Sequence, residues 1–288
     1  MKRQILPFFL MVLLMISLVF SCVSVSAELA VPKRKVVEET TTYEASTVRI
    51  KVEQWLYDFN KSDLRFFVAE VWVKDPSQFK TAFARDEYSK NRTEATSAIA
   101  ERHGAVLACN GDYYNYKDKI GLVIRNGELY RDKTNKNRDI LLVMKDGSLV
   151  AIPRNEYEAG HGKEYVDEGV VHSFTFGPIL VKDGQPYDFP KSHDPIYTSE
   201  TVREPRTGIG WVEEGHYVFL VADGRRDNWS DKGMALQEMR EVFYEKGCQV
   251  AYNLDGGGSA TLYINGQRVN KTSGSREREV SDIICIVP

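Results

Sequence analysis

Residues 253–260 form the stretch of the sequence best suited to chemistry. A carboxylate, Asp255, follows a predicted buried strand, and after it come Gly256, Gly257, Gly258 and Ser259. Glycine at this density destabilises a chain unless the backbone must approach another group closely. The sequence TLYINGQRV that follows predicts a hairpin, which excludes a P-loop and a dinucleotide-binding turn, because both need a helix here. We expect the three glycine amides and the Ser259 hydroxyl to form a nest for an anionic oxygen, with a tight hairpin corner as the alternative.

Residues 203–211 offer a cation for the same anion. Arg206 and Thr207 stand at the start of a predicted strand, where a guanidinium can hold two phosphate oxygens at once. A surface ion pair with a nearby glutamate is the alternative role for this arginine. A further carboxylate, Asp223, ends the predicted strand YVFLVA, and in isolation the Asp-Gly-Arg sequence there indicates only a turn.

Two segments that end in polar loops follow the same pattern. Gly104 is followed six residues on by Asn110, and Gly247 is followed by Asn253 at the same offset. Each unit reads helix, glycine cap, buried strand and loop, and the first loop begins Asn110, Gly111, Asp112. We therefore expect both loops to leave comparable strand ends, where binding groups gather. An internal duplication and the general frequency of helix-glycine-strand units are equally good explanations of the match.

The spacing of apolar residues predicts few helices and many strands. Helical spacing occurs in residues 93–103 and 234–246, while VRIKVEQWLYDF and LRFFVAEVWV show the aromatic and β-branched enrichment of strands. Pairs of Asn-Gly or Asp-Gly, which predict hairpins, stand between apolar runs and begin at Asn126, Asp146, Asp183 and Asn265. The fold class is therefore α+β and sheet-rich, with hairpins and two main helices packed on the sheets.

The N-terminus predicts an export signal. Lys2 and Arg3 precede an uncharged apolar run over residues 5–20. We expect cleavage after Ala27, with a weaker cleavage point before Cys22, or retention as an N-terminal membrane anchor, because the run approaches the roughly 20 residues that span a bilayer. Residues 1–27 are then the signal or anchor, residues 28–46 a spacer without periodicity, and residues 47–288 one secreted or extracytoplasmic domain.

Charge and cysteine usage exclude several classes of protein. The chain has 38 Lys and Arg against 41 Asp and Glu, which argues against nucleic acid as a ligand, because phosphate-backbone binding needs a concentrated basic surface. Outside the signal, Cys109, Cys248 and Cys285 stand far apart, so neither a zinc site nor a disulfide scaffold is indicated, and we expect one disulfide and one buried thiol. Without EF-hand or zincin spacing, we expect no metal and no cofactor.

Five segments, taken in order, resemble the phosphodiester glycosidase family: NGDYYN, TFGPILVKDG, EPRTGIGW, LVADGR and NLDGGGSATLY. The similarity runs from about Asn110 to the C-terminus, and the Asp-Gly-Gly-Gly-Ser element is its most specific motif. Such proteins commonly have a small residue at the third position of the first loop, where this sequence has Asp112, so no shared role is transferred to that residue. The resemblance implies an exported hydrolase that cleaves a carbohydrate phosphodiester, a sugar-1-phosphodiester of envelope or extracellular glycans.

A substrate of this kind makes particular demands on the site. The leaving group is a phosphate ester of low pKa that departs as an anion, so positive charge matters more than a proton donor. We expect Arg206 and the glycine amides to bind phosphate while one carboxylate faces the anomeric carbon. Asp255 is the first choice for that carboxylate, Asp223 the second and Asp112 the third. The remaining groups expected to contact substrate are Asn110, Gly111, Thr207, Asn253 and Ser259.

Two other functions would use the same residues. The first is a non-catalytic module that binds anionic envelope glycans, and the second is a metal-dependent phosphodiesterase that cuts the P–O bond. A serine-hydrolase triad is poorly supported, because Ser259 does not stand in a G-x-S-x-G elbow. We expect His172, His193 and Asp194 to be structural, and aromatic residues such as Tyr113, Trp211 and Trp229 to line a sugar site or to belong to the core.

Overall fold

The computed structural model describes residues 34–59, 62–115, 120–134, 138–189, 201–225 and 233–288. The predicted export signal lies outside these residues, as do His193, Asp194 and Trp229. Residues Lys33–Pro288 belong to one compact unit. Within the described ranges, no helix has the length and apolar character needed to cross a membrane.

The largest sheet has eight strands, all paired antiparallel. In spatial order they are β1 (Arg34–Glu44), β2 (Val48–Phe59), β3 (Ser62–Val73), β14 (His216–Ala222), β13 (Arg206–Glu213), β15 (Val250–Asn253), β11 (Ile179–Lys182) and β12 (Gln185–Pro186). The edge strand β1 corrects the predicted spacer, because residues 34–44 pair with β2 along their whole length. An edge strand pairs on one side only and commonly carries charged side chains. The charged and Thr-rich sequence of this strand therefore shows no apolar alternation from which a strand could be predicted.

Three smaller sheets complete the strands described. The five-stranded sheet contains β17 (Gln267–Arg268), β16 (Leu262–Ile264), β5 (Leu107–Asn110), β18 (Asp282–Ile286) and β4 (Phe79–Phe83). The others are β10 (Val170–Thr175), β8 (Ile140–Met144) and β9 (Leu149–Ile152), and the pair β6 (Leu122–Arg125) and β7 (Glu128–Asp132). The four predicted turns, beginning at Asn126, Asp146, Asp183 and Asn265, all join antiparallel neighbours, and the glycine of each has a positive φ.

Two of the helices are those that the sequence predicts. α2 (Thr96–Arg102) and α4 (Leu236–Glu245) fall inside the expected ranges, and both are followed by a glycine in the left-handed conformation, Gly104 and Gly247. A third, α3 (Gly162–Asp167), is only six residues long, too short to show a repeated apolar spacing. The sheet-rich α+β class is confirmed.

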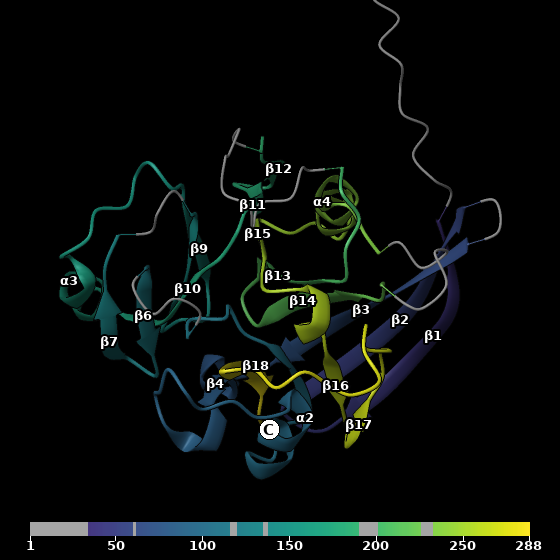
Figure 1. Cartoon of the computed structure of the whole chain (residues 1–288), viewed down its shortest axis with the longest axis horizontal. Coiled ribbons are helices and arrows are strands. Elements are labelled where there is room, and N and C mark those ends of the chain that lie inside the picture. Colours follow the sequence, from purple (N-terminus) through teal and green to yellow (C-terminus); the bar gives the residue numbers. More distant parts are fainter. Residues whose placement is uncertain (1–33, 60–61, 116–119, 135–137, 190–200, 226–232) are drawn as a thin grey trace, which may run out of the picture. The chain divides into compact units, whose positions relative to one another are not determined.

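Alternation along the strands divides the core into layers. Tyr217, Phe219 and Val221 of β14 face a central core that also receives Cys109 from the five-stranded sheet. The intervening Val218 and Leu220 pack with Met239, Val242 and Phe243 of α4 on the other face. On the far side of the five-stranded sheet, residues of α2 pack on β5 and β18. Figure 1 shows α4 beside β11 and β15, and α2 beside β18.

The cysteines follow these layers and correct the predicted disulfide. Cys109, Cys248 and Cys285 are all buried free thiols. Cys109 lies in the central core, Cys248 against α4, and Cys285 on the α2 face of the five-stranded sheet. Cys109 and Cys285 lie on the neighbouring strands β5 and β18, but their side chains point to opposite faces of the sheet, so their sulfur atoms cannot form a bond.

Candidate active site

Asn110 brings three separate segments of the chain together. It ends β5 and is fully buried. Its amide nitrogen donates to the backbone oxygen of Asp255 at 2.7 Å, and its side-chain oxygen accepts from the Thr207 hydroxyl at 2.8 Å and the Thr261 amide at 3.3 Å. The two polar loops predicted from the sequence therefore meet directly. Both the nitrogen and the oxygen of the Asn110 side-chain amide are hydrogen-bonded to protein groups, so this side chain holds the two loops in place.

Asp255 is the carboxylate at the centre of this junction. The residue is 8% exposed, and its Oδ2 accepts from Arg278 Nη2 at 3.2 Å. Burial raises the pKa of Asp255, and the negative charge of Asp112 adds to this effect. The Ser259 hydroxyl, the Arg278 charge and the Gly256 amide favour the ionised form and lower the pKa. A buried carboxylate with one hydrogen-bonded guanidinium is a candidate for catalysis on physical grounds.

Each of the three consecutive glycines allows a close approach. A Cβ on Gly256 would lie 2.4 Å from the Pro205 carbonyl oxygen. At Gly257 a Cβ would lie 3.2 Å from Arg225 Nη1, and at Gly258 3.2 Å from Cδ and Nε of Arg278. The Gly257 amide donates to Pro205 O at 2.9 Å, so the three amides do not all face an anion as a nest would require. The glycines instead let two guanidinium groups lie against the turn.

Arg278 is the site residue that sequence reasoning missed. It donates from Nε to the Ser259 hydroxyl at 3.0 Å, and from Nη2 to Ser259, to Asp255 and to the Gly256 carbonyl. Its side chain is nevertheless 49% exposed, and Nη1 makes no hydrogen bond within the described chain. Neither its spacing from Asp255 nor its charged neighbours in the SREREV sequence signals this contact. Only the fold brings residue 278 to the turn.

Arg206 and Asp223 lie near the site but are engaged with the backbone. Arg206 is 7% exposed, and it donates from Nε to Met234 O at 3.1 Å and from Nη2 to Val202 O at 2.9 Å. Burial lowers its pKa to about 10. Asp223 is 4% exposed and accepts from the Lys271 amide at 2.9 Å. Their predicted roles, phosphate binding and catalysis, stay predictions.

The second predicted asparagine also sits at its strand end. Asn253 is 1% exposed, and its amide nitrogen donates to Gly177 O at 2.7 Å. Its side-chain oxygen has no hydrogen-bond partner among the described residues. Asn253 lies on β15 opposite Gly208 of β13, two residues before Asp255. It keeps one acceptor that a hydroxyl or a water could satisfy.

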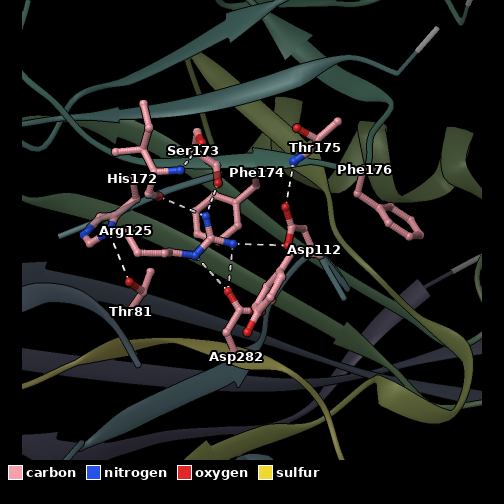
Figure 2. Close-up of polar contacts among 12 residues, drawn as sticks. Thr81, Asp112, Arg125, His172, Ser173, Phe174, Thr175, Phe176 and Asp282 are labelled. Atoms are coloured by element: carbon pink, nitrogen blue, oxygen red, sulfur yellow. Dashed lines mark hydrogen bonds and ion pairs between the residues drawn. The ribbon is translucent and has the colours of Figure 1, made fainter. Parts of the chain in front are cut away.

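Asp112 belongs to a buried ion cluster instead of the turn around Asp255. Its Oδ1 accepts from Arg125 Nη2 at 3.1 Å, and the same guanidinium contacts Asp282 at 2.7 Å. Figure 2 shows Arg125 between the two carboxylates. This pairing explains how a carboxylate replaces the small residue expected at the third position of the loop. Gly111 beside it must remain small, because a Cβ there would lie 2.3 Å from Asp282 Oδ1.

His172 and two aromatic residues can now be placed. His172 is buried, accepts from the Asn126 amide at 3.1 Å, and has its pKa lowered to about 3 by burial and by the Arg125 charge. It is therefore neutral and structural. Trp211 packs against the central core. Tyr113, which has a positive φ of 67° that is costly for an aromatic residue, lies with its ring centroid 5.9 Å from Arg278 Cζ.

No three His, Cys, Asp or Glu side chains gather as metal ligands in the described part of the chain. The cluster of Asp112 and Asp282 already has a cation, the guanidinium of Arg125. Around Asp255 the positive charge also comes from an arginine.

Comparison with known sequences places this chain in a family. A family model described as phosphodiester glycosidase matches residues 103–287, more than half of the chain. The human N-acetylglucosamine-1-phosphodiester alpha-N-acetylglucosaminidase is 30% identical over 194 residues, which cover 62% of this chain and 37% of that protein. The mouse protein of the same name is 26% identical over 212 residues, covering 69% and 40%. The prophage-derived protein YomE of Bacillus subtilis is 27% identical over 256 residues, covering 88% and 35%.

This chain thus spans about two fifths or less of the length of these relatives. The catalytic domain of the zebrafish N-acetylglucosamine-1-phosphodiester alpha-N-acetylglucosaminidase has the same fold, with a TM-score of 0.69 at 19% identity over 90% of this chain and 89% of that one. A hypothetical protein from Synechocystis gives a TM-score of 0.56 at 14% identity, over 86% and 63%. On the strength of the family match and the shared fold, the chain belongs to the phosphodiester glycosidase family.

Proposed function

We propose that this protein hydrolyses the glycosyl C–O bond of a sugar-1-phosphodiester, with Asp255 as the catalytic carboxylate. The observation that carries the proposal is the pairing of a nearly buried Asp255 with a half-exposed Arg278 at 3.2 Å. The carboxylate would face the anomeric carbon, where positive charge develops in the transition state. The guanidinium beside it would face the phosphate, where negative charge develops.

Two arginines are available for the leaving group. Arg278 and Arg225 lie against Gly258 and Gly257, so both guanidinium groups border the same turn. Arg225 is 56% exposed and paired with Glu204. Planar guanidinium groups match pairs of phosphate oxygens, and they would stabilise an alkyl phosphate that leaves without a proton. We therefore assign phosphate binding first to Arg278, with Arg225 as the second cation.

The remaining side chains would support binding of the sugar. The ring of Tyr113 lies on the Arg278 side of the site, and its strained backbone indicates a conformation that the surrounding structure imposes. We assign it to one face of the sugar ring. Arg206, which ties its own strand to Met234 and Val202, would keep the Pro205 carbonyl against the glycine turn. Asp223 would hold the segment at Lys271 in the same way.

The ionisation of Asp255 sets the expected pH dependence. Burial raises its pKa above the usual range of a carboxyl group. Since the mechanism needs the ionised form, activity is present above the raised pKa and is lost as the pH falls through it. The same burial means that the charged carboxylate contributes little to the stability of the fold.

We further propose that the protein acts outside the cytoplasm, on sugar phosphodiesters of envelope or extracellular glycans. The support is the sequence alone, namely Lys2 and Arg3 followed by the uncharged run over residues 5–20. The mass of the chain recovered from the cell exterior tests this proposal. A cytoplasmic chain that keeps Met1 would contradict it.

The experiment that tests the activity uses purified protein and a chromogenic sugar-1-phosphodiester. Turnover by the wild type and its loss in Asp255→Asn would support the proposal. A protein that binds the substrate without turnover would instead be a glycan-binding module. Turnover that Asp255→Asn leaves unchanged would remove Asp255 from the mechanism.

A further inference from the structure

Arg125 is saturated with hydrogen bonds inside the protein. Its side chain is fully buried at the end of β6. Nε donates to Asp282 Oδ2 at 2.8 Å, Nη1 donates to the backbone oxygens of Ile124 and Ser173, and Nη2 contacts Asp282 at 2.7 Å and Asp112 at 3.1 Å. These five contacts match the five N–H donors of a guanidinium. Figure 2 shows the guanidinium group of Arg125 beside Asp112, Asp282 and Ser173, and with all five donors used Arg125 has none left for a ligand.

The cluster holds two carboxylates and only one guanidinium. Asp112 and Asp282 both have side chains that are 1% exposed or less. Asp112 Oδ2 also accepts from the Thr175 amide at 2.8 Å, whereas Asp282 Oδ1 has no hydrogen-bond partner among the described residues. With both carboxylates ionised, the cluster would carry one uncompensated negative charge in a buried place, which is costly.

The cluster is joined to the catalytic turn through one short segment. Gly111 donates its amide to Asp282 O at 3.0 Å, and Asp112 follows it immediately. Asn110, which precedes it, donates to Asp255 O at 2.7 Å. The segment 110–112 therefore lies between Asp282 on one side and Asp255 on the other. Movement of Asp112 would move the group that holds the Asp255 backbone.

We propose that Asp112 is a positioning residue for Asp255, anchored by Arg125 and Thr175 so that it fixes the segment 110–112 and places a second buried carboxylate behind the catalytic one. The proposal depends on the proposed function only for the measurement of kcat/KM, and not for the NMR titration of Asp255.

The charges around both carboxylates support this role. Asp255 faces Arg278 and the Ser259 hydroxyl, which favour its ionised form, and Asp112, which opposes it. In the cluster, burial and Asp112 raise the pKa of Asp282 to about 7 against the opposing effect of Arg125. The other titratable groups there are Tyr114, whose pKa is raised by burial, and His172, which is neutral. Loss of the Asp112 charge should thus lower the pKa of Asp255.

The charge count also predicts that the test variant folds. Asp112→Asn keeps the shape of the side chain and leaves Arg125 paired one-to-one with Asp282, so no buried charge is left uncompensated. Asp112→Gly is the second variant, because it removes the side chain together with its contacts to Arg125 and Thr175. The matched control is Asp146→Asn, which removes an exposed carboxylate in the turn between β8 and β9.

The experiment follows the carboxyl carbon of Asp255 by 13C NMR during a pH titration of aspartate-labelled protein, with the resonance assigned from Asp255→Asn. We expect a lower Asp255 pKa in Asp112→Asn and Asp112→Gly, and no change in Asp146→Asn. The acid limb of the pH profile of kcat/KM should move in the same direction. An unchanged Asp255 pKa in both Asp112 variants would overturn the inference. Absence of turnover with the NMR shift intact would overturn the proposed function alone, because the titration needs no substrate.

Discussion

Replacing Arg278 by lysine keeps a positive charge beside Asp255 but removes the planar fork. In the wild type, Nη2 reaches Asp255 Oδ2 at 3.2 Å while Nε holds the Ser259 hydroxyl at 3.0 Å. A lysine ammonium presents a single point of charge and cannot hold both of these groups and a phosphate oxygen in the same geometry. Arg278→Lys should therefore weaken transition-state binding and leave the fold intact.

The size of the effect follows from the contacts that are lost. A hydrogen bond to a charged group contributes about 1.5–3 kcal/mol, and the variant loses one to phosphate together with part of the hold on Asp255. We expect a loss of about 3 kcal/mol, which corresponds to a fall in kcat/KM of about 10²-fold. Because the Arg278 side chain is 49% exposed, the free energy of unfolding should change by less than about 1 kcal/mol.

The assay compares two substrates and two variants. Arg278→Lys should lose much less activity on an aryl glycoside, whose leaving group has no phosphate, than on a sugar-1-phosphodiester. Arg276→Lys is the matched control, because Arg276 is exposed in the same segment, and it should behave like the wild type. A kcat/KM for Arg278→Lys within about threefold of the wild type, under about 0.7 kcal/mol, would refute the assignment. Equal losses on both substrates would show that Arg278 supports the site without binding phosphate.

Three further predictions concern the Asp255→Asn variant, the pH dependence of activity and metal ions. Asp255→Asn should abolish turnover and leave the thermal unfolding midpoint nearly unchanged, because the substitution removes a charge that burial already disfavours. A large fall in the midpoint would instead indicate that residues 255–259 serve only as a tight hairpin corner. The wild-type kcat/KM should fall as the pH drops through the pKa of Asp255, which burial raises above the usual range of a carboxyl group. A flat profile over that range would show that activity does not depend on the ionisation of this carboxylate. Activity should survive EDTA, because arginine supplies the positive charge that a metal ion would otherwise provide; full loss restored by one divalent ion would indicate a metal-dependent phosphodiesterase.

Local signals in the sequence predicted much of the fold. Apolar spacing located α2 and α4, and the Asn-Gly and Asp-Gly pairs marked turns between antiparallel strands. The shared offsets of Asn110 and Asn253 suggested two loops at comparable strand ends, and the first of these loops does contact the Asp255 segment. Each of these features depends on neighbouring residues, which a sequence displays directly.

Long-range partners could not be predicted in the same way. Arg125 reads as an ordinary residue before an Asn-Gly turn, and Asp282 as one before an apolar strand, yet they are 157 residues apart and share a buried ion pair. The burial of Arg206 against the backbone of Met234 and Val202 is equally invisible in the sequence, because these contacts depend on how the chain folds back on the strand. Arg278 was missed because a charged run is usually a solvated surface. Pairing between distant segments is decided by the order of strands in the sheets.

Hydrolysis in heavy-oxygen water tests the central claim most directly. The purified protein is given a sugar-1-phosphodiester in water enriched in 18O, and both products are analysed by mass spectrometry. Attack at the anomeric carbon, next to Asp255, predicts that the label enters the sugar and that the phosphate ester is released without it. Label in the phosphate product would show that the P–O bond is cut, and would contradict the assignment of this site as a glycosidase.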